Sequence, residues 1–103
     1  MRIVQIKSTA TTGQSDPFEP RTNTVSLQVL AEAAGAVAAT YQVKGRSMPN
    51  MPLENIGDPV ALTGTNSASG SVTLSSLCAG QILADFSLVS CTSLSVVAVE
   101  ANS

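Results

Sequence analysis

The stretch "TNTVSLQVLAEAAGAVAATYQVKGRS" (Thr22–Ser47) decides the fold class, because it reads either as strands or as a helix. Apolar and polar residues alternate through both halves with the period of two that strands show. The row on one face is Val25, Leu27, Val29, Ala31, Val37, Ala39, Tyr41 and Val43. "EAAG", ending at Gly35, predicts a tight reversal, and hence two strands, residues 22–31 and 36–47. A helix over residues 25–40 is the alternative, since Ala and Leu favour helices, but Gly35 and the Thr- and Val-rich flanks favour strands.

The same alternation extends outward from this stretch. Further strands are predicted over residues 2–8, 58–64, 71–77, 81–89 and 94–101. "TNSASG" (65–70) and "SCTS" (90–93) are predicted turns, and "QILADFSLV" places Ile82, Ala84, Phe86 and Leu88 on one face. The chain is thus predicted to be all-β, a single small β-sandwich domain over residues 1–103, jelly-roll-like or immunoglobulin-like, with about seven antiparallel strands. Residues 9–21, interrupted by Gly13, Pro17 and Pro20, are expected to form a loop or arm.

Composition excludes several classes of function. The chain has 103 residues with 5 basic and 7 acidic side chains, a net charge of −2, and so lacks the basic stripe that a nucleic-acid binder uses. Its longest apolar run, residues 33–39, is far shorter than the roughly 20 residues that span a bilayer. The first residues, "MRIVQIKSTATTG", do not have the form of a secretory signal, so synthesis in a cytoplasm is expected.

The two cysteines, Cys78 and Cys91, are predicted to be free thiols. "AGQILADFSLVS" lies between them and reads as one extended strand. At about 3.3 Å per residue this strand separates the cysteines by roughly 40 Å, whereas a disulfide needs Cα atoms about 5.5 Å apart.

No catalytic, cofactor-binding or metal-binding residue is predicted. The chain has no histidine, and the carboxylates of Asp16 and Glu19, on either side of Phe18, have no further acidic residues close in sequence. "GTNSASG" is not followed by the lysine of a phosphate loop. Asp85, in mid-strand, either faces solvent, which we favour, or pairs across strands with Lys44 or Arg46.

The loop at residues 47–58, within "RSMPNMPLENIGDP", is the candidate protein interface. Each of its methionines precedes a proline, which biases the methionine backbone towards extended geometry. We therefore expect an extended arm over Ser47–Leu53 that displays two adaptable thioethers to a partner. The interface residues predicted are Met48, Pro49, Asn50, Met51, Pro52, Leu53 and, as an exposed aromatic, Phe18. Alternatively, Leu53 and Ile56 fold back to cover one end of the sandwich.

The order of segments from Ala36 to Glu100 resembles that of the small β-sandwich virion proteins of tailed bacteriophages. These are head decoration (cement) proteins and related tail-associated modules. "QVKGRS" (Gln42–Ser47) and "ADFSLVSCTSLSVVAV" (Ala84–Val99) occupy the places of the family's "V-x-V-x-G-S" strand and its closing strand pair. The loop between them, "MPNMPLEN", differs from the Asp-, Gly- and Trp-containing loop that is usual in this family.

The resemblance implies a non-enzymatic structural protein on the virion, without cofactor, that binds the major capsid protein or another virion protein. A tail-associated carbohydrate- or receptor-binding module is the alternative, and an adhesion or fibre subunit is disfavoured by the lack of a signal peptide. The strand "LSVVAVEA" is apolar on both faces, so a homo-oligomer, dimer or trimer, is expected to cover it. Neither a nucleic acid nor a membrane is an expected partner.

Overall fold

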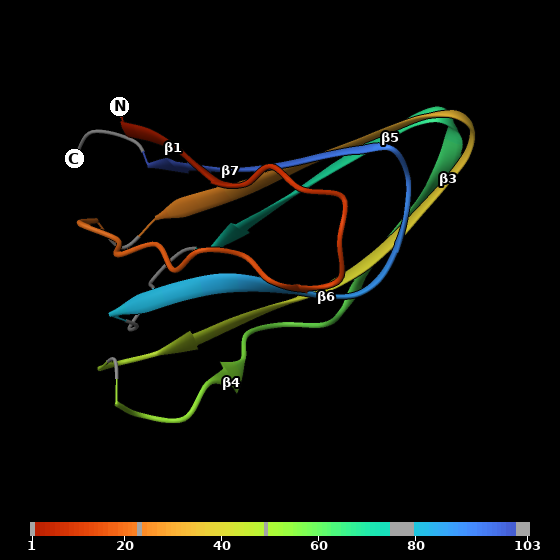
Figure 1. Ribbon diagram of the computed structural model, residues 1–103. Coiled ribbons are helices and arrows are strands. Elements are labelled where there is room, and N and C mark those ends of the chain that lie inside the picture. Colours follow the sequence, from red (N-terminus) through yellow and green to blue (C-terminus); the bar gives the residue numbers. More distant parts are fainter. Residues whose placement is uncertain (1, 23, 49, 75–79, 101–103) are drawn as a thin grey trace.

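The computed structural model describes residues 2–22, 24–48, 50–74 and 80–100, and every regular element in these ranges is a β-strand (Figure 1). The strands are β1 (Arg2–Lys7), β2 (Gly13–Gln14), β3 (Val25–Arg46), β4 (Glu54–Asn55), β5 (Val60–Leu74), β6 (Gln81–Ser90) and β7 (Ser93–Glu100). They form one antiparallel sheet of seven strands in the order β1-β7-β3-β6-β2, with β4 and β5 also paired to β3. The predicted all-β class with about seven antiparallel strands is confirmed.

The sheet is organised around β3, which is 22 residues long and pairs with β4, β5, β6 and β7. Residues 25–32 of β3 lie between β7 and residues 67–74 of β5, with β1 beyond β7. We call this part the first half-sheet. Residues 36–46 of β3 lie between β6 on one side and β4 and residues 60–65 of β5 on the other, with β2 beyond β6. This part is the second half-sheet.

The two half-sheets are layers of one curled sheet, joined at a corner where β3 and β5 bend together (right of Figure 1). Between Glu32 and Ala36 the pairing with β5 shifts, so that residues 33–35 of β3 lie opposite Asn66 alone. Asn66 has a φ of 67°, a left-handed conformation that Asn tolerates better than most residues. The carbonyl of Glu32 accepts hydrogen bonds from the amide and the hydroxyl of Thr92 at 2.9 and 3.0 Å, so the bend leaves this acceptor satisfied.

The core lies between the inner faces of the two half-sheets. Odd-numbered residues of β3 point inward along the whole strand, and Val25, Leu27, Val29, Val37, Tyr41 and Val43 are all at most 2% exposed. Tyr41 packs against Phe86 with ring centroids 5.2 Å apart, a separation at which tilted aromatic pairs stabilise each other. The two layers approach each other closely at β5. A Cβ atom added to Gly70 would lie only 2.8 Å from the side chain of Leu62 in the other half-sheet.

None of the three predicted turns joins a hairpin, and the seven strands differ from those expected. "EAAG" lies inside β3 and "TNSASG" inside β5, while the strands on either side of "SCTS", β6 and β7, follow one another along the same side of β3. All three segments lie at the corner instead. The inward row predicted for β6 fails at its end, because a bulge at Ser87 shifts the pairing with β3 and leaves Leu88 48% exposed.

The segment predicted as an arm, residues 9–21, is held along the free edge of β6. β2 pairs with Asp85 and Phe86, and Phe18 exchanges backbone hydrogen bonds of 2.8 and 2.9 Å with Ile82. The amide of Ser15 donates to the carbonyl of Ala84 at 2.8 Å. This segment therefore connects β1 of the first half-sheet to β6 of the second.

Cys91 lies at the bend between β6 and β7, half-buried against the core, with a free thiol. β6 is one extended strand, as predicted, whereas Cys78 lies outside the described residues. The ranges that the structure describes contain no helix long and apolar enough to cross a membrane.

Gly64 is expected to be the most demanding position at the corner. A Cβ there would lie 2.4 Å from the backbone carbonyl oxygen of Ser67, so Gly64→Ala requires the backbone to shift. We expect a loss of about 1–3 kcal/mol in the free energy of unfolding, measured by chemical denaturation. Thr63→Ala, at an exposed neighbouring position, is the control and is expected to change stability little. Equal stability of the two variants would show that the corner is not tightly constrained.

Candidate interaction surface

The loop at residues 47–58 leaves β3 at the open end of the curled sheet, opposite the corner (lower left of Figure 1). Its second part is firmly attached to β3. β4 pairs with Lys44 and Gly45, and the amide of Ile56 donates to the carbonyl of Val43 at 2.8 Å. The side-chain amide of Gln42 donates to the carbonyls of Ile56 and Gly57 at 3.2 and 3.1 Å. The part of the loop that follows the methionines, residues 54–57, is thus held close to the sheet.

The two methionines are exposed, as predicted, but the segment is not extended. Met48 is 57% and Met51 47% exposed, and Asn50 and Pro52 are exposed as well. The amide of Met51 donates to the carbonyl of Met48 at 3.0 Å, which closes a four-residue turn. The prediction of an extended arm over Ser47–Leu53 is therefore wrong. Pro49, also predicted at the interface, lies outside the described residues.

The remaining predicted interface residues are less accessible. Ile56 packs against the core, as in the alternative in which apolar loop residues cover one end of the sandwich. Leu53 is half-buried and is not among the residues packed against the core. Phe18 is only 3% exposed, and the guanidinium of Arg2 lies 4.6 Å from its ring centroid. The expectation that Phe18 is an exposed aromatic is wrong, because its backbone pairing with Ile82 turns the ring into the core.

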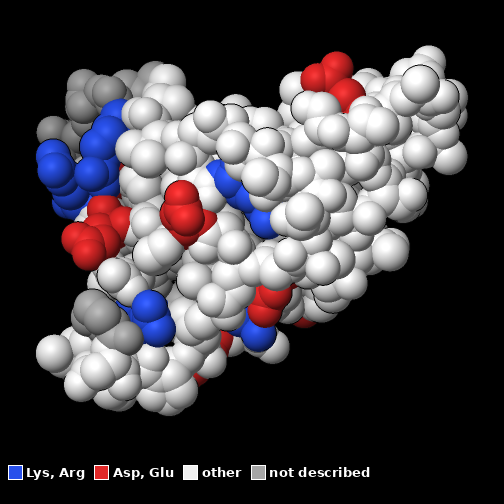
Figure 2. All heavy atoms as spheres, viewed as in Figure 1, with Lys and Arg blue, Asp and Glu red and all other residues white. Residues whose placement is uncertain are grey.

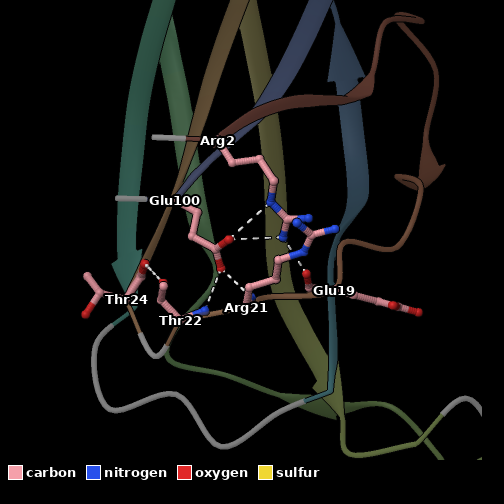
Figure 3. A network of polar contacts seen from close by, with 6 residues as sticks. All are labelled: Arg2, Glu19, Arg21, Thr22, Thr24 and Glu100. Carbon is pink, nitrogen blue, oxygen red and sulfur yellow. Dashed lines mark hydrogen bonds and ion pairs between the residues drawn. The ribbon is translucent and has the colours of Figure 1, made fainter. Parts of the chain in front are cut away.

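Glu100, at the end of β7, holds the other side of the open end together (Figure 3). Its side chain is 4% exposed and forms an ion pair of 3.1 Å with Arg2 of β1. Its second carboxylate oxygen accepts hydrogen bonds from the backbone amides of Arg21 and Thr22, at 2.8 Å for Thr22. Arg2 also donates to the carbonyl of Glu19 at 2.6 Å. One carboxylate therefore joins β1, β7 and the segment that follows Phe18.

The pKa of Glu100 is lowered from its ordinary value of 4.5. Burial alone would raise the pKa, but the backbone hydrogen bonds from Thr22 and Arg21 and the charge of Arg2 outweigh burial. The ionised carboxylate consequently stabilises the folded state.

Charged side chains gather near the ends of β1 and β7 at the left of Figure 2, while much of the remaining visible surface is uncharged. On the outer face of the second half-sheet, Asp85 pairs with Lys44 at 3.3 Å, with both side chains about 30% exposed. Asp85 thus lies on the outer face, as favoured, and also forms the cross-strand pair that was the alternative. Arg46 donates to Gln81 at 3.0 Å, and Gln81 donates to Glu19 at 3.3 Å.

Burial also raises the pKa of Tyr41, whose hydroxyl has no hydrogen-bond partner within the described residues. Because an unpaired buried hydroxyl is unfavourable, we expect Tyr41→Phe to leave stability unchanged or to raise it, by up to about 1–3 kcal/mol. Thermal unfolding of the two proteins at neutral pH measures the difference. A clear loss of stability would show that the hydroxyl has a partner in solution.

The described residues contain no group of three or more His, Cys, Asp or Glu side chains able to hold a metal ion. Sequence reasoning missed Glu100 and Gln42, the two residues that fix the open end and the loop. Glu100 is the one charged residue in "LSVVAVE" and continues the inward row of Leu94, Val96 and Ala98. A carboxylate in such a row requires partners, and this was the available signal.

Comparison with known proteins gives no match to a family model, to a curated protein or to a solved structure. The resemblance to phage virion proteins remains a prediction.

The stability of the protein is expected to decrease at acidic pH through Glu100. A carboxylate whose pKa is lowered by folding stabilises the folded state above its ordinary pKa of 4.5, and this contribution is lost as pH falls through the folded-state value. Glu100→Gln should lose roughly 1–3 kcal/mol at pH 7, through its buried hydrogen bonds, and should show a weaker dependence on acidification. Denaturation between neutral and acidic pH measures both effects.

Glu54→Gln is the matched control, because it removes an exposed carboxylate of β4. It should behave as the wild type at neutral pH. If Glu100→Gln and Glu54→Gln have the same stability and pH dependence, Glu100 does not hold the open end together.

Proposed function

We propose that this chain is a non-enzymatic structural virion protein, a bacteriophage capsid decoration (cement) protein that binds and stabilises the assembled head. The observation that carries the proposal is the pair of exposed methionines, Met48 at 57% and Met51 at 47%. They lie on a hydrogen-bonded turn, residues 48–51, which we call the methionine turn, and the loop that follows this turn is attached to β3 through β4. Methionine adapts to irregular apolar surfaces, and a turn that is already formed loses less conformational entropy on docking. Such a surface suits binding to another protein.

The proposed partner is the major capsid protein or another virion protein, with synthesis in the host cytoplasm and a final position on the capsid surface. A small domain that binds the assembled shell but not its free subunits stabilises the shell by mass action. Where one copy contacts two shell subunits, the second contact forms at high effective concentration, so modest interfaces give firm attachment.

The alternative, a tail-associated carbohydrate- or receptor-binding module, is less well supported. Sugar-binding sites use exposed aromatic rings as apolar platforms. The three aromatic residues of the chain, Phe18, Tyr41 and Phe86, are all at most 3% exposed. The apolar side chains available for contact are aliphatic or thioether groups.

The test is co-purification with intact heads, with the stoichiometry to the major shell protein, followed by Met48→Ser combined with Met51→Ser. We expect the double variant to lose head binding while its melting temperature changes little, because both side chains are exposed. Leu88→Ser is the matched control. Leu88 is as exposed as Met51, at 48%, but lies on β6 near the corner, so this variant should still bind.

Absence of the wild-type protein from purified heads would contradict the proposed function. A drop in melting temperature with unchanged binding in the double variant would show that the methionines stabilise the fold and do not contact a partner.

A further inference from the structure

β5 is an open edge of the sheet. It is 15 residues long, and within the described residues β3 is the only strand that pairs with it. In an antiparallel pair, alternate residues direct their backbone N–H and C=O groups away from the partner strand. β5 therefore presents a row of backbone donors and acceptors that another strand can bind.

The other edges of the sheet carry features that oppose strand pairing. β1 has Arg2 and Lys7 at its ends and a bulge between Gln5 and Lys7, and β2 is two residues long. Charge, bulges and short length are the means by which natural proteins prevent edge-to-edge association. β5, "VALTGTNSASGSVTL", contains no charged residue and no proline. Among the described strands, β5 alone provides an edge that is both long and unprotected.

We propose that residues 67–74 of β5 pair edge to edge with the same segment of a second copy of this chain, which forms a two-fold symmetric dimer. The first part of β5 is less suited, because Pro59 and Asp58 precede it and β4, with Glu54, continues the same edge. Residues 67–74 lie in the first half-sheet, and the pairing joins two such half-sheets into one eight-stranded sheet, β1-β7-β3-β5 followed by its symmetry mate.

A second copy fits this edge for two reasons. A two-fold axis pairs an antiparallel segment with itself, and an uncharged segment then meets no like charge. Side chains beside the edge are also small. Ser69, Gly70 and Ser71 line an open hollow of about 500 Å³ on the outer face, together with Gln28, Leu30 and Val97.

The dimer is independent of the proposed virion role, since it uses β5 and not the methionine turn. It gives the domain two copies of that turn. Because one strand pair buries a small area, we expect a dissociation constant in the micromolar range.

The experiment measures mass by sedimentation velocity from low to high micromolar concentration, with purified protein alone. The test variant, Ser69→Lys with Ser71→Lys, places two cations on the outer side of the paired edge. The matched control, Ile3→Lys with Gln5→Lys, adds two lysines to the same outer face at the opposite edge, where Gln5, Val97, Gln28 and Ser71 form one row across the sheet. Circular dichroism checks that both variants fold.

We expect dimers for the wild type and the control and monomers for the test variant, with at least a tenfold rise in its dissociation constant. Hydrogen exchange on the wild type gives a second measurement, in which the alternate amides of residues 67–74 that face away from β3 lose protection on dilution while those of β1 do not. A wild type that stays monomeric, a test variant that still dimerises, a control that dissociates, or exchange in residues 67–74 that is independent of concentration overturns the proposal. Because heads are not used, failure here is distinct from failure of the proposed function.

Discussion

The structure depends on the unbroken alternation of β3. Side chains of a strand alternate between faces, so one inserted residue would move every later apolar side chain to the wrong face. β3 passes the corner without such a shift, and its odd-numbered residues remain inward in both half-sheets. One strand can therefore supply the inner face of both layers, and β5 bends beside it at Asn66. Strand pairing therefore continues from one layer into the other. In a fold of two separate sheets, loops would join the layers instead.

The fold class could be predicted from the sequence because period-two patterns are local. The path of the chain could not, because "EAAG" and "TNSASG" have the composition of turns and become a corner only when β3 and β5 bend together. One signal was present. The inward rows before and after Gly35 are in phase, since Val29, Ala31, Val37 and Ala39 are all odd-numbered, and a continuous strand requires this whereas a hairpin does not.

The candidate site was predicted in part. Exposure of Met48 and Met51 follows from their position in a proline-rich loop that no strand can absorb, and the structure places both side chains at the surface. The prediction that their backbone is extended was wrong, because a hydrogen bond between the two methionines closes a turn. The prediction that Phe18 is exposed was wrong because of a contact that is distant in the sequence. Its burial depends on pairing with Ile82, 64 residues away, and such long-range contacts leave no local pattern.

The distribution of charge determines how such a surface can bind. Arg2 is engaged by Glu100 and Glu19, Lys44 by Asp85, and Arg46 by Gln81, so several of the few charged groups are paired within the molecule. The methionine turn and β5 carry no charge of their own. Long-range electrostatic attraction would therefore contribute little to the proposed association at either surface, and its affinity would have to come from apolar contact and backbone hydrogen bonds. Because salt screens charge interactions and leaves these contacts largely intact, the proposed binding through either surface is expected to depend weakly on ionic strength.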